Sequence, residues 1–454
     1  MKLASYPAYR TSRIEWVQKV PVDWEECSAK INFLMQLGKM LQNDPSGLED
    51  IEISYLKALH VNWNRVTTED LSKMWASPSE LEQYAISNGD LLVCEGGEVG
   101  RAAIIKGLEE PAIIQNALHR LRNTKRGDVR YFAYLLKHIA DAGWFAILCN
   151  KATIAHLTGD KLGAIYMPVP TVSEQQQIAA FLDWKTGQID ALIARKKELL
   201  EKLKEKRIAV ITQAVTKGLN PASPMRDSGI PWLGQVPKHW EVKRLRFLLC
   251  ERFTNGLFKK AEYWGDGCRI VNVTDLYIHN DLVDETLLER LECDDGEVQT
   301  YAAQHGDFFV VRSSLKPEGI GKSAALLNPS EPTVFECHIV RGRPKLDEVH
   351  PRFLNLFMNS TYARQYFMTR ANVVTMATID QEKIKNLIMA LPEYHEQEQI
   401  AQYLDKYLAR IDAMVATTEK AMERLEEYRT ALITAATTGK IDVRNVKVPV
   451  PAKP

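Results

Sequence analysis

Two long stretches of the chain carry apolar residues at spacings that alternate between four and three. The stripe in the second stretch consists of Ile400, Leu404, Tyr407, Ile411, Met414, Thr418, Ala421, Leu425, Tyr428 and Leu432. Subtracting 222 from each number gives the stripe in the first stretch: Ile178, Leu182, Lys185, Ile189, Leu192, Lys196, Leu199, Leu203, Lys206 and Val210. This is the heptad period of a coiled coil, so the sequence predicts two long helices whose apolar seams pair with each other.

The limits of both helices follow from the residues at their ends. Ser173-x-x-Gln after Pro168 and Pro170 is a capping-box pattern, and the second helix follows Pro392. We therefore expect helices over residues 173–217 and 395–439. At about 1.5 Å per residue, roughly 40 residues make a rod of about 60 Å, which is longer than a domain of about 140 residues is wide. This length favours a spacer over two unrelated helices that each pack on their own domain.

The chain also contains an internal repeat. Trp16 and Trp24 are matched by Trp232 and Trp240 at an offset of 216. Further matches are Gly89-Asp90 with Gly306-Asp307, Val99-Gly100-Arg101 with Ile320-Gly321-Lys322, Glu174-Gln175 with Glu396-Gln397, Leu182-Asp183 with Leu404-Asp405, and Ile189-Asp190 with Ile411-Asp412. The offset grows slowly to 222, and the order never changes, so the two halves are copies of one unit. Between these landmarks the copies scarcely resemble each other, as expected if each binds something different.

The repeat and the two stripes together predict the architecture. We expect an α+β protein with two globular domains in tandem, separated by two long helices that form an antiparallel coiled coil with a pseudo-two-fold internal repeat. The expected segments are a first domain over 1–172, a helix over 173–217, a linker and second domain over 218–394, a helix over 395–439 and a tail over 440–454. Lysines at seam positions of the first helix leave open that part of its stripe meets a partner subunit instead.

Composition limits the class of protein. The chain has 454 residues, of which 45% are hydrophobic and 26% charged, which suits a globular protein of two or three domains. No apolar run approaches the roughly 20 residues of a membrane span, and no signal peptide is recognisable, so we expect a cytoplasmic protein without membrane contact. Seven scattered cysteines without a Cys-x-x-Cys pair suit reduced thiols.

The charge balance gives an ambiguous answer about a nucleic-acid partner. Lysine plus arginine equal aspartate plus glutamate at 58 each, whereas phosphate binding usually needs a basic surface. Many of the acidic residues lie in the two predicted helices, for example Glu198, Glu201, Glu423 and Glu426. The two domains can therefore still present local basic surfaces.

Several segments resemble one protein family. The segment from Arg226 to Val242, with Asp-Ser-Gly-Ile-Pro-Trp at its start, closely resembles the opening of target recognition domains in type I restriction-modification specificity subunits. The helix starts from Pro170 to Ile178 and from Pro392 to Ile400 are similar to the Pro-x-x-x-Glu-Gln-x-x-Ile starts of that family. The first copy departs from it, with Thr11-Ser-Arg-Ile14 in place of the intact opening, and Ala390 stands where the first copy has Pro168.

The resemblance implies a DNA reader without catalytic activity. Each recognition domain would read one half of a split double-stranded DNA target, and the helices would fix the gap. Two modification methyltransferase subunits would dock along the helices, and restriction motor-nuclease subunits would complete the complex. S-adenosylmethionine, ATP and magnesium would then belong to those other subunits, with no cofactor in this chain.

The sequence contains no intact methyltransferase, nucleotide-binding or metal-binding motif. Asn220-Pro221-Ala222-Ser223 fails as the base-holding turn of an adenine methyltransferase at its third residue, and Lys316 stands where a Walker A loop ending at Ser323 needs its first glycine. The histidines and cysteines show no spaced metal-ligand pattern. We therefore expect no catalytic or metal-binding residue. The alternatives are a protein-interaction scaffold with two peptide-binding domains on a coiled coil, and then a nicking or modifying enzyme of unrecognised type.

Basic residues in equivalent turns are the candidates for DNA contact. They are Arg101, Arg120 and Arg122 in the first copy and Arg312, Lys316, Lys322, Arg341 and Arg343 in the second. Glycines beside them permit close approach to phosphates or guanine edges, although each could equally be an ordinary solvated turn residue. For docking or helix pairing, the candidates are Ile178, Leu182, Ile189, Leu192, Leu199, Leu203, Ile400, Leu404, Ile411, Met414, Leu425 and Leu432.

Overall fold

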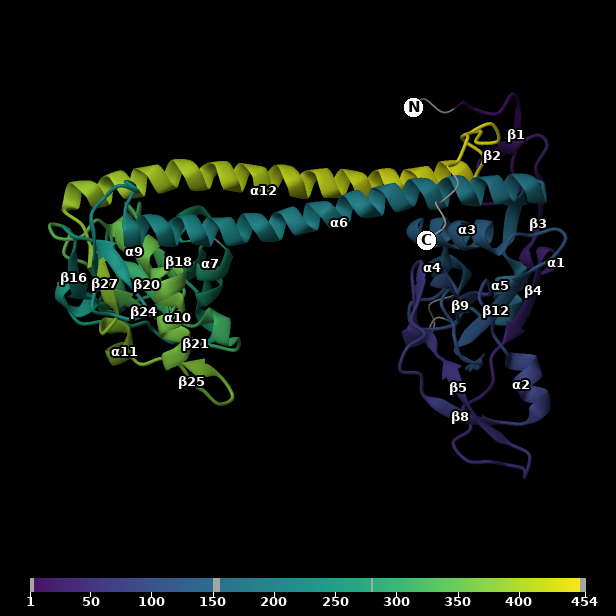
Figure 1. Ribbon diagram of the computed structural model, residues 1–454, viewed down its shortest axis with the longest axis horizontal. Helices are drawn as coiled ribbons and strands as arrows, with labels where there is room; N and C mark the ends of the chain where they lie inside the picture. Colours follow the sequence, from purple (N-terminus) through teal and green to yellow (C-terminus); the bar gives the residue numbers. More distant parts are fainter. Residues whose placement is uncertain (1–3, 150–155, 279–280, 450–454) are drawn as a thin grey trace. The chain divides into compact units, whose positions relative to one another are not determined.

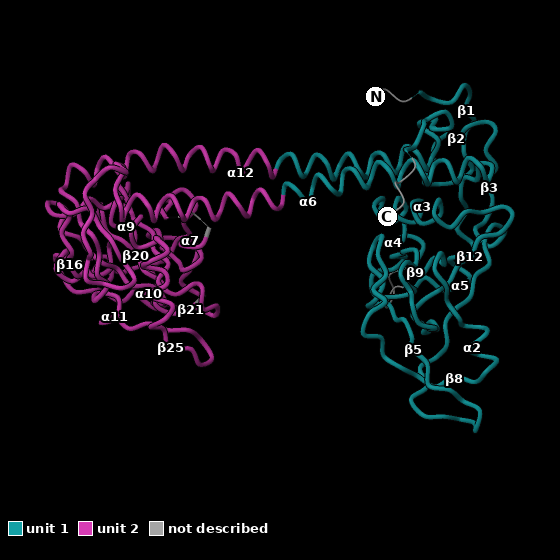
Figure 2. The backbone as a smooth tube through the Cα atoms, in the orientation of Figure 1, with its two compact units in different colours: residues 1–196, 420–454 teal, residues 197–419 magenta. Residues whose placement is uncertain are grey.

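The computed structural model describes residues 4–149, 156–278 and 281–449. The chain divides into two compact units (Figure 2): unit 1 comprises residues 1–196 and 420–454, and unit 2 comprises residues 197–419. Each unit contains one globular domain together with half of each long helix. The boundary between the two compact units falls within both helices. The predicted segments, which separate each helix from the globular domains, describe a different division and stay a prediction.

Unit 1 is built on two small sheets. The first has the order β10-β9-β12-β4 and is antiparallel throughout; the second has the order β11-β5-β8, with β11 and β5 parallel. The strands are β4 (Phe33–Leu37), β5 (Ile51–Leu56), β8 (Lys73–Ala76), β9 (Leu91–Cys94), β10 (Ala102–Ile104), β11 (Ala112–Ile114) and β12 (Leu118–Asn123). Two further pairs join β1 (Tyr9–Thr11) with β2 (Lys19–Pro21), and β3 (Glu25–Ser28) with β13 (Tyr166–Val169).

Unit 2 repeats both sheets in the same order. Its first sheet is β22-β20-β24-β17, which matches β10-β9-β12-β4. Its second sheet is β23-β18-β19, which matches β11-β5-β8, and β18 and β23 are parallel. The strands are β17 (Thr254–Asn255), β18 (Trp264–Val271), β19 (Glu289–Leu291), β20 (Phe308–Val311), β22 (Ser323–Ala325), β23 (Thr333–Phe335) and β24 (Ile339–Gly342). The strand pairs β14 (Met225–Asp227) with β15 (Gln235–Pro237), and β16 (Glu241–Arg244) with β27 (Ile388–Leu391), correspond as well. The predicted internal repeat is thus confirmed.

Short helices and strands complete the two domains. In unit 1 they are α1 (Ala29–Asn32), α2 (Pro78–Tyr84), α3 (Val129–Asp141), α4 (Trp144–Leu148), α5 (Gly159–Ala164), β6 (Val61–Asn62) and β7 (Arg65–Val66). In unit 2 they are α7 (Val273–Ile278), α8 (Asp295–Tyr301), α9 (Pro351–Met358), α10 (Thr361–Arg370), α11 (Gln381–Lys385), β21 (Ser313–Ser314), β25 (Asn372–Val373) and β26 (Ala377–Thr378). The fold class, α+β with two tandem domains, is as predicted (Figure 1).

The strand β9 and its counterpart β20 are apolar at every position because both faces of their sheet are covered. Leu91 and Val93 pack in the core that contains α3, whereas Leu92 packs in the core between the two sheets. In unit 2, Phe308 belongs to the core with α9, and Phe309 to the core between the sheets. A strand buried on both faces reads as a continuous apolar run and not as an alternating one.

The two long helices are present with nearly the predicted limits. Helix α6 spans Val172–Lys217 and α12 spans Tyr394–Thr437, so both begin one residue earlier than expected, and α12 ends two residues earlier. The capping-box interpretation of Ser173 was wrong, because the Thr171 hydroxyl accepts the hydrogen bond from the Glu174 N–H, at 3.3 Å. Gly218 and Gly439 follow the two helices with φ of 74° each, the left-handed conformation that ends many helices.

The predicted seam is only partly right. The buried members are Ile178, Leu182, Ile189, Leu203, Ile400, Leu404, Ile411 and Leu432, and Leu425 is partly buried. Leu192, Leu199 and Met414 are exposed and do not pack between the helices, so of the two roles expected for them subunit docking stays a prediction. Ile193 and Val415 pack inward instead. The sequence could not show which of two neighbouring residues faces the core, because both Leu192 and Ile193, and both Met414 and Val415, are apolar.

Equivalent ion pairs join the two helices within each unit. In unit 2, Arg207 of α6 donates to Asp412 of α12 at 2.7 Å, and in unit 1, Arg429 of α12 donates to Asp190 of α6 at 3.0 Å. Both pairs obey the repeat offset of 222 (429 − 207 and 412 − 190). The helix segments run antiparallel in each unit, since Gln177, before Asp190 in the chain, donates to the carbonyl of Val443, which follows Arg429.

The segment after α12 belongs to unit 1. Val443 is fully buried, and the N–H of Asp442 donates to the carbonyl of Ala4 at 2.8 Å. Residues 440–449 therefore pack against the first domain, although the sequence suggested a tail over 440–454. None of the helices in the described part of the chain is long and apolar enough to cross a membrane.

Candidate nucleic-acid interface

The glutamines at the starts of the long helices fix each domain to its helix. The fully buried Gln175 accepts a hydrogen bond from the Asp128 N–H at 2.9 Å and donates to the carbonyls of Arg126 and Pro170. Gln397 makes the same three contacts in unit 2: with the His350 N–H at 2.8 Å, and with the carbonyls of Glu348 and Pro392. One buried amide side chain thus satisfies three backbone groups in each copy, which explains structurally why the glutamine recurs.

We expect Gln397→Leu to destabilise unit 2 by about 2 kcal/mol, because it leaves the buried Pro392 carbonyl and the part-buried His350 N–H and Glu348 carbonyl without this partner. The exposed Gln399→Leu, two residues further along the same helix, is the matched control and should change stability little. Thermal unfolding of both variants is the measurement. Equal melting temperatures would show that Gln397 contributes no more than a surface residue.

The glutamates beside these glutamines hold the opening segments of the two domains. The carboxylate of Glu174 accepts from the Trp24 indole at 3.2 Å and from the Tyr6 hydroxyl at 2.6 Å. In unit 2, the carboxylate of Glu396 accepts from the Trp240 indole at 3.1 Å and is paired with His239 at 2.8 Å. The second tryptophan of each repeat is therefore a structural residue and lies at the joint between domain and helix.

Four of the predicted DNA-contacting arginines are held by structural bonds. Arg122 forms two hydrogen bonds with Asp90, at 2.8 and 2.9 Å, and Arg343 forms two with Asp307, at 2.9 and 2.8 Å. These bonds raise the pKa of both guanidinium groups. Because Asp307 has no exposed surface, this ion pair anchors the interior of unit 2.

The neighbouring arginines are nearly buried and bind backbone carbonyls. Arg120 donates to the carbonyl of Ala85, and Arg341 donates to that of Ala302 at 2.9 Å. Burial lowers the pKa of both guanidinium groups. Their recurrence in both copies therefore has a structural explanation, and DNA contact by these arginines stays a prediction.

The predicted equivalent hairpins exist in both units. Strands β9 and β10 pair antiparallel, as do β20 and β22, and Gly100 and Gly321 lie in their turns with φ of 77° and 72°. In unit 1, Arg101 is bound to Glu98 at 3.1 Å and to the carbonyl of Ala58 at 2.9 Å. This guanidinium is therefore held against its own domain.

The hairpin of unit 2 is longer and presents a more basic tip. Lys316 is exposed, and its side chain makes no hydrogen bond or ion pair with any of the described residues. Arg312 is half-buried and donates to Asn255 at 3.2 Å, and Lys322 donates to the carbonyl of Tyr277 at 2.9 Å. Of the candidates in this hairpin, Lys316 is the one placed to meet a phosphate without first breaking a contact.

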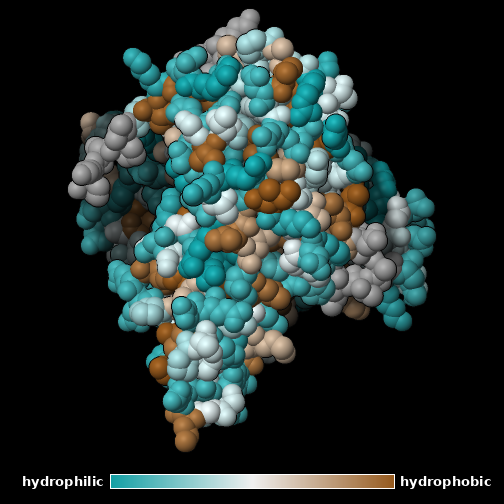
Figure 3. Space-filling model, turned by 90° about the vertical axis from the view of Figure 1, so that its right-hand side faces the viewer, coloured by the Kyte–Doolittle hydropathy of each residue, from teal (hydrophilic) through white to brown (hydrophobic). Residues whose placement is uncertain are grey.

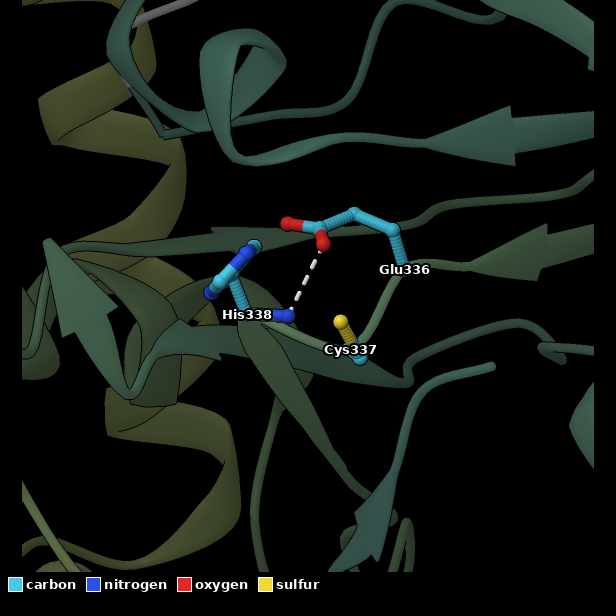
Figure 4. Close-up of side chains that lie close together, drawn as sticks. All are labelled: Glu336, Cys337 and His338. Atoms are coloured by element: carbon cyan, nitrogen blue, oxygen red, sulfur yellow. Dashed lines mark hydrogen bonds between the residues drawn. The ribbon is translucent and has the colours of Figure 1, made fainter. Parts of the chain in front are cut away.

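Three consecutive residues in unit 2 could offer metal ligands. The side chains of Glu336, Cys337 and His338 converge in the turn between β23 and β24 (Figure 4). Glu336 already accepts from the N–H of His338 at 2.8 Å, and the His338 ring is bonded to the Ser313 hydroxyl at 2.5 Å. The spacing patterns considered in the sequence did not single out this group. Unit 1 has Gln115, Asn116 and Ala117 at the equivalent positions, so the shared framework does not depend on it.

The face of unit 1 shown in Figure 3 is mostly hydrophilic, with small separate apolar areas in place of one continuous patch. A surface of this kind suits a polar ligand better than a large apolar protein interface. The two units therefore share a structural framework and differ at the tips of their hairpins.

Comparison with known proteins identifies the family. The family model described as "Type I restriction modification DNA specificity domain" matches residues 64–205 and 237–424, which is more than half of the chain. The chain therefore belongs to the type I restriction-modification specificity subunits. Its function is that of the specificity subunit in such a system. The scaffold with two peptide-binding domains, the alternative left open by the sequence, finds no support in these matches.

Relatives and solved structures agree with this assignment. The specificity subunit of the type I restriction enzyme EcoKI from Escherichia coli K12 is 25% identical over 403 residues, covering 87% of this chain and 83% of the relative. A structure from a study of complex assembly and conformational transition in the type I system covers 93% of this chain and 99% of its own, with a TM-score of 0.70 and 14% identity. The HsdS subunit of Thermoanaerobacter tengcongensis covers 93% and 98%, with a TM-score of 0.54 and 15% identity.

Proposed function

We propose that each recognition domain reads one half of a split, asymmetric DNA target, while the paired helices fix the gap between the halves. The observation that supports this most directly is the contrast within the repeat. The two sheets, the Asp–Arg anchors and the glutamine contacts recur in both units. In contrast, the β20–β22 hairpin of unit 2 is longer than the β9–β10 hairpin of unit 1 and carries Lys316, and Glu336, Cys337 and His338 stand where unit 1 has Gln115, Asn116 and Ala117. A shared framework with different tips suits two different half-targets.

The rest of the assembly is proposed from the family. Two modification methyltransferase subunits would dock along the helices, and motor-nuclease subunits would add restriction. S-adenosylmethionine, ATP and magnesium would be bound by those subunits, and this chain would contribute recognition without catalysis in the cytoplasm. The exposed Leu192, Leu199 and Met414, which do not pack between the helices, are available for such docking.

Methylation mapping of the host genome tests the split target. If both domains read the same face of B-form DNA, half-site centres should be about one helical turn, or about 10 base pairs, apart. We expect two unequal short motifs with unspecified bases between them, and loss of that methylation when the gene for this chain is deleted. A single continuous motif would contradict the proposal.

Lys316 provides the test at the level of one residue. We expect Lys316→Ala to weaken binding of the assembled complex to its target and to reduce the slope of log affinity against log salt by about 1, because one phosphate contact is lost. Lys238→Ala removes an exposed lysine elsewhere in unit 2 and serves as the control. Binding isotherms at several salt concentrations measure the slope, and an unchanged slope would remove Lys316 from the interface.

A further inference from the structure

Unit 2 contains a groove of about 1150 Å³ between α6 and the globular domain. One wall is the α6 face that carries Lys204, Ile208 and Ile211, and the opposite wall includes the hairpin tip around Lys316 and helix α10. The spacing of four and three places these α6 residues on one face of the helix. The groove therefore has a helical wall with an apolar stripe on it.

The lining combines apolar side chains with positive charge. Ile208 is 45% exposed and Leu315 80% exposed, and Met368 also has an exposed side chain. Among the described residues, the charged lining consists of Lys204, Arg207, Lys316, Lys322 and Arg364, with Glu318 as the single carboxylate. An occupant must cover apolar surface and also supply negative charge.

Two of these cations, Lys322 and Arg364, are half-buried, and no carboxylate of the described residues is hydrogen-bonded to them. Arg364 donates to the carbonyls of Ile320 and Glu318, and Lys322 donates to the carbonyl of Tyr277. Burial lowers the pKa of Arg364 to about 10, and burial followed by the charge of Arg364 lowers the pKa of Lys322. Arg207, in contrast, is already paired with Asp412. A bound anion would therefore give Lys322 and Arg364 a hydrogen-bonded carboxylate, which neither has among the described residues.

Several charged and apolar residues that line the groove have no equivalent in unit 1. Adding the repeat offset of 222 to Lys204 and Ile208 gives Glu426 and Thr430, and subtracting it from Arg364 gives Ala142. Lys316 lies in the stretch inserted in the second hairpin and has no counterpart. Unit 1 thus replaces two cations and an apolar residue of the groove with an acid, an alanine and a threonine.

We propose that this groove binds one acidic, amphipathic helix of a protein subunit of the restriction-modification complex, once per specificity chain. A helix about 10 Å across and about 15 Å long, or about ten residues, fills roughly this volume. Its apolar face would pack on Ile208, Leu315 and Met368, and its carboxylates would face Lys204, Lys322 and Arg364, as in other helix-in-groove contacts. The polar backbone of a DNA duplex would leave the apolar lining uncovered, which favours a protein segment.

Matched substitutions on α6 test the proposal with the full chain and a purified modification methyltransferase subunit as the probe. We expect Ile208→Asp to weaken their binding roughly tenfold or more, because it places a carboxylate on the apolar wall. Lys204→Glu should weaken binding by a smaller factor that grows at low salt. Ala209→Asp on α6 and Lys238→Glu elsewhere in unit 2 make the same charge changes at exposed positions outside the groove and should bind like the unaltered chain.

A photo-crosslinking amino acid identifies the occupant. Placed at position 208, it should capture an acidic segment of the methyltransferase subunit in the assembled complex with DNA present; at the exposed Phe258, outside the groove, it should not. Capture of DNA alone at position 208, or equal binding by the groove variants and their controls, overturns the inference. The inference rests on the proposed assembly: if the unaltered chain does not bind the methyltransferase subunit, both fall together, whereas equal binding by all variants removes the groove alone.

Discussion

The Asp307→Ala variant is expected to lose about 4 kcal/mol of stability in unit 2, because it removes the fully buried carboxylate that binds Arg343 and lies beside the nearly buried Arg341. Asp307 is fully buried, accepts two hydrogen bonds from Arg343 and one from the Gln304 N–H at 2.8 Å, and lies 3.8 Å from Arg341. Glu251, the other carboxylate near the two arginines, is 41% exposed and cannot replace a buried partner fully.

Calorimetry of the full chain measures the loss, and hydrogen exchange assigns it to a unit. Exchange should accelerate in β20 and β24, which carry Asp307 and the arginines at their ends. The exposed Asp347→Ala, in the same unit, is the control and should melt like the unaltered chain. Adding Arg343→Met to Asp307→Ala should recover part of the stability, since the second change removes one of the unpaired charges. If Asp307→Ala and Asp347→Ala have the same melting temperature, the Asp307–Arg343 ion pair does not stabilise unit 2.

Most of the framework could be predicted because the sequence is duplicated, and residues that both copies need for folding recur in the same order. Gly89-Asp90 and Gly306-Asp307 recur because each aspartate binds an arginine that lies in or directly after the strand paired with its own, β12 or β24. Gln175 and Gln397 recur because each satisfies three backbone groups. The repeat located these residues. It did not reveal their partners, since an arginine that binds a buried carboxylate and one that binds DNA look the same in a sequence.

The features that could not be predicted depend on the direction in which side chains point and on which distant segments pack together. In the helices, Leu192 and Ile193 are both apolar, and only packing shows that Ile193 faces inward. At the hairpins, Arg101 and Lys322 were equivalent by sequence, yet one is bound to Glu98 and the other turns into the groove of unit 2. The groove itself combines α6 with residues from 273 to 376, and no local pattern brings these segments together.

A close backbone contact that recurs in both units predicts the second large effect. A Cβ atom on Gly256 would lie 2.1 Å from the carbonyl oxygen of Glu336, and one on Gly38 would lie 2.2 Å from that of Gln115. Both obstacles are backbone atoms, which cannot rotate away as a side chain can. The adjacent residues Lys39 and Leu257 form parallel bridges with the same two partners, so the contact joins the two sheets in each copy.

We expect Gly256→Ala to destabilise unit 2 by about 3 kcal/mol, at the upper end of the range for overpacking, because the strands must separate to admit the methyl group. Gly187→Ala is the matched control: a Cβ atom there would have none of the described residues within 4 Å, and alanine favours a helix over glycine by up to about 1 kcal/mol, so this variant should be slightly more stable. Thermal unfolding compares the two, and hydrogen exchange in residues 333–342 should rise in Gly256→Ala alone. A Gly256→Ala protein as stable as the control would mean that the sheets have room to move apart, and the two-sheet framework would then be less rigid than these contacts require.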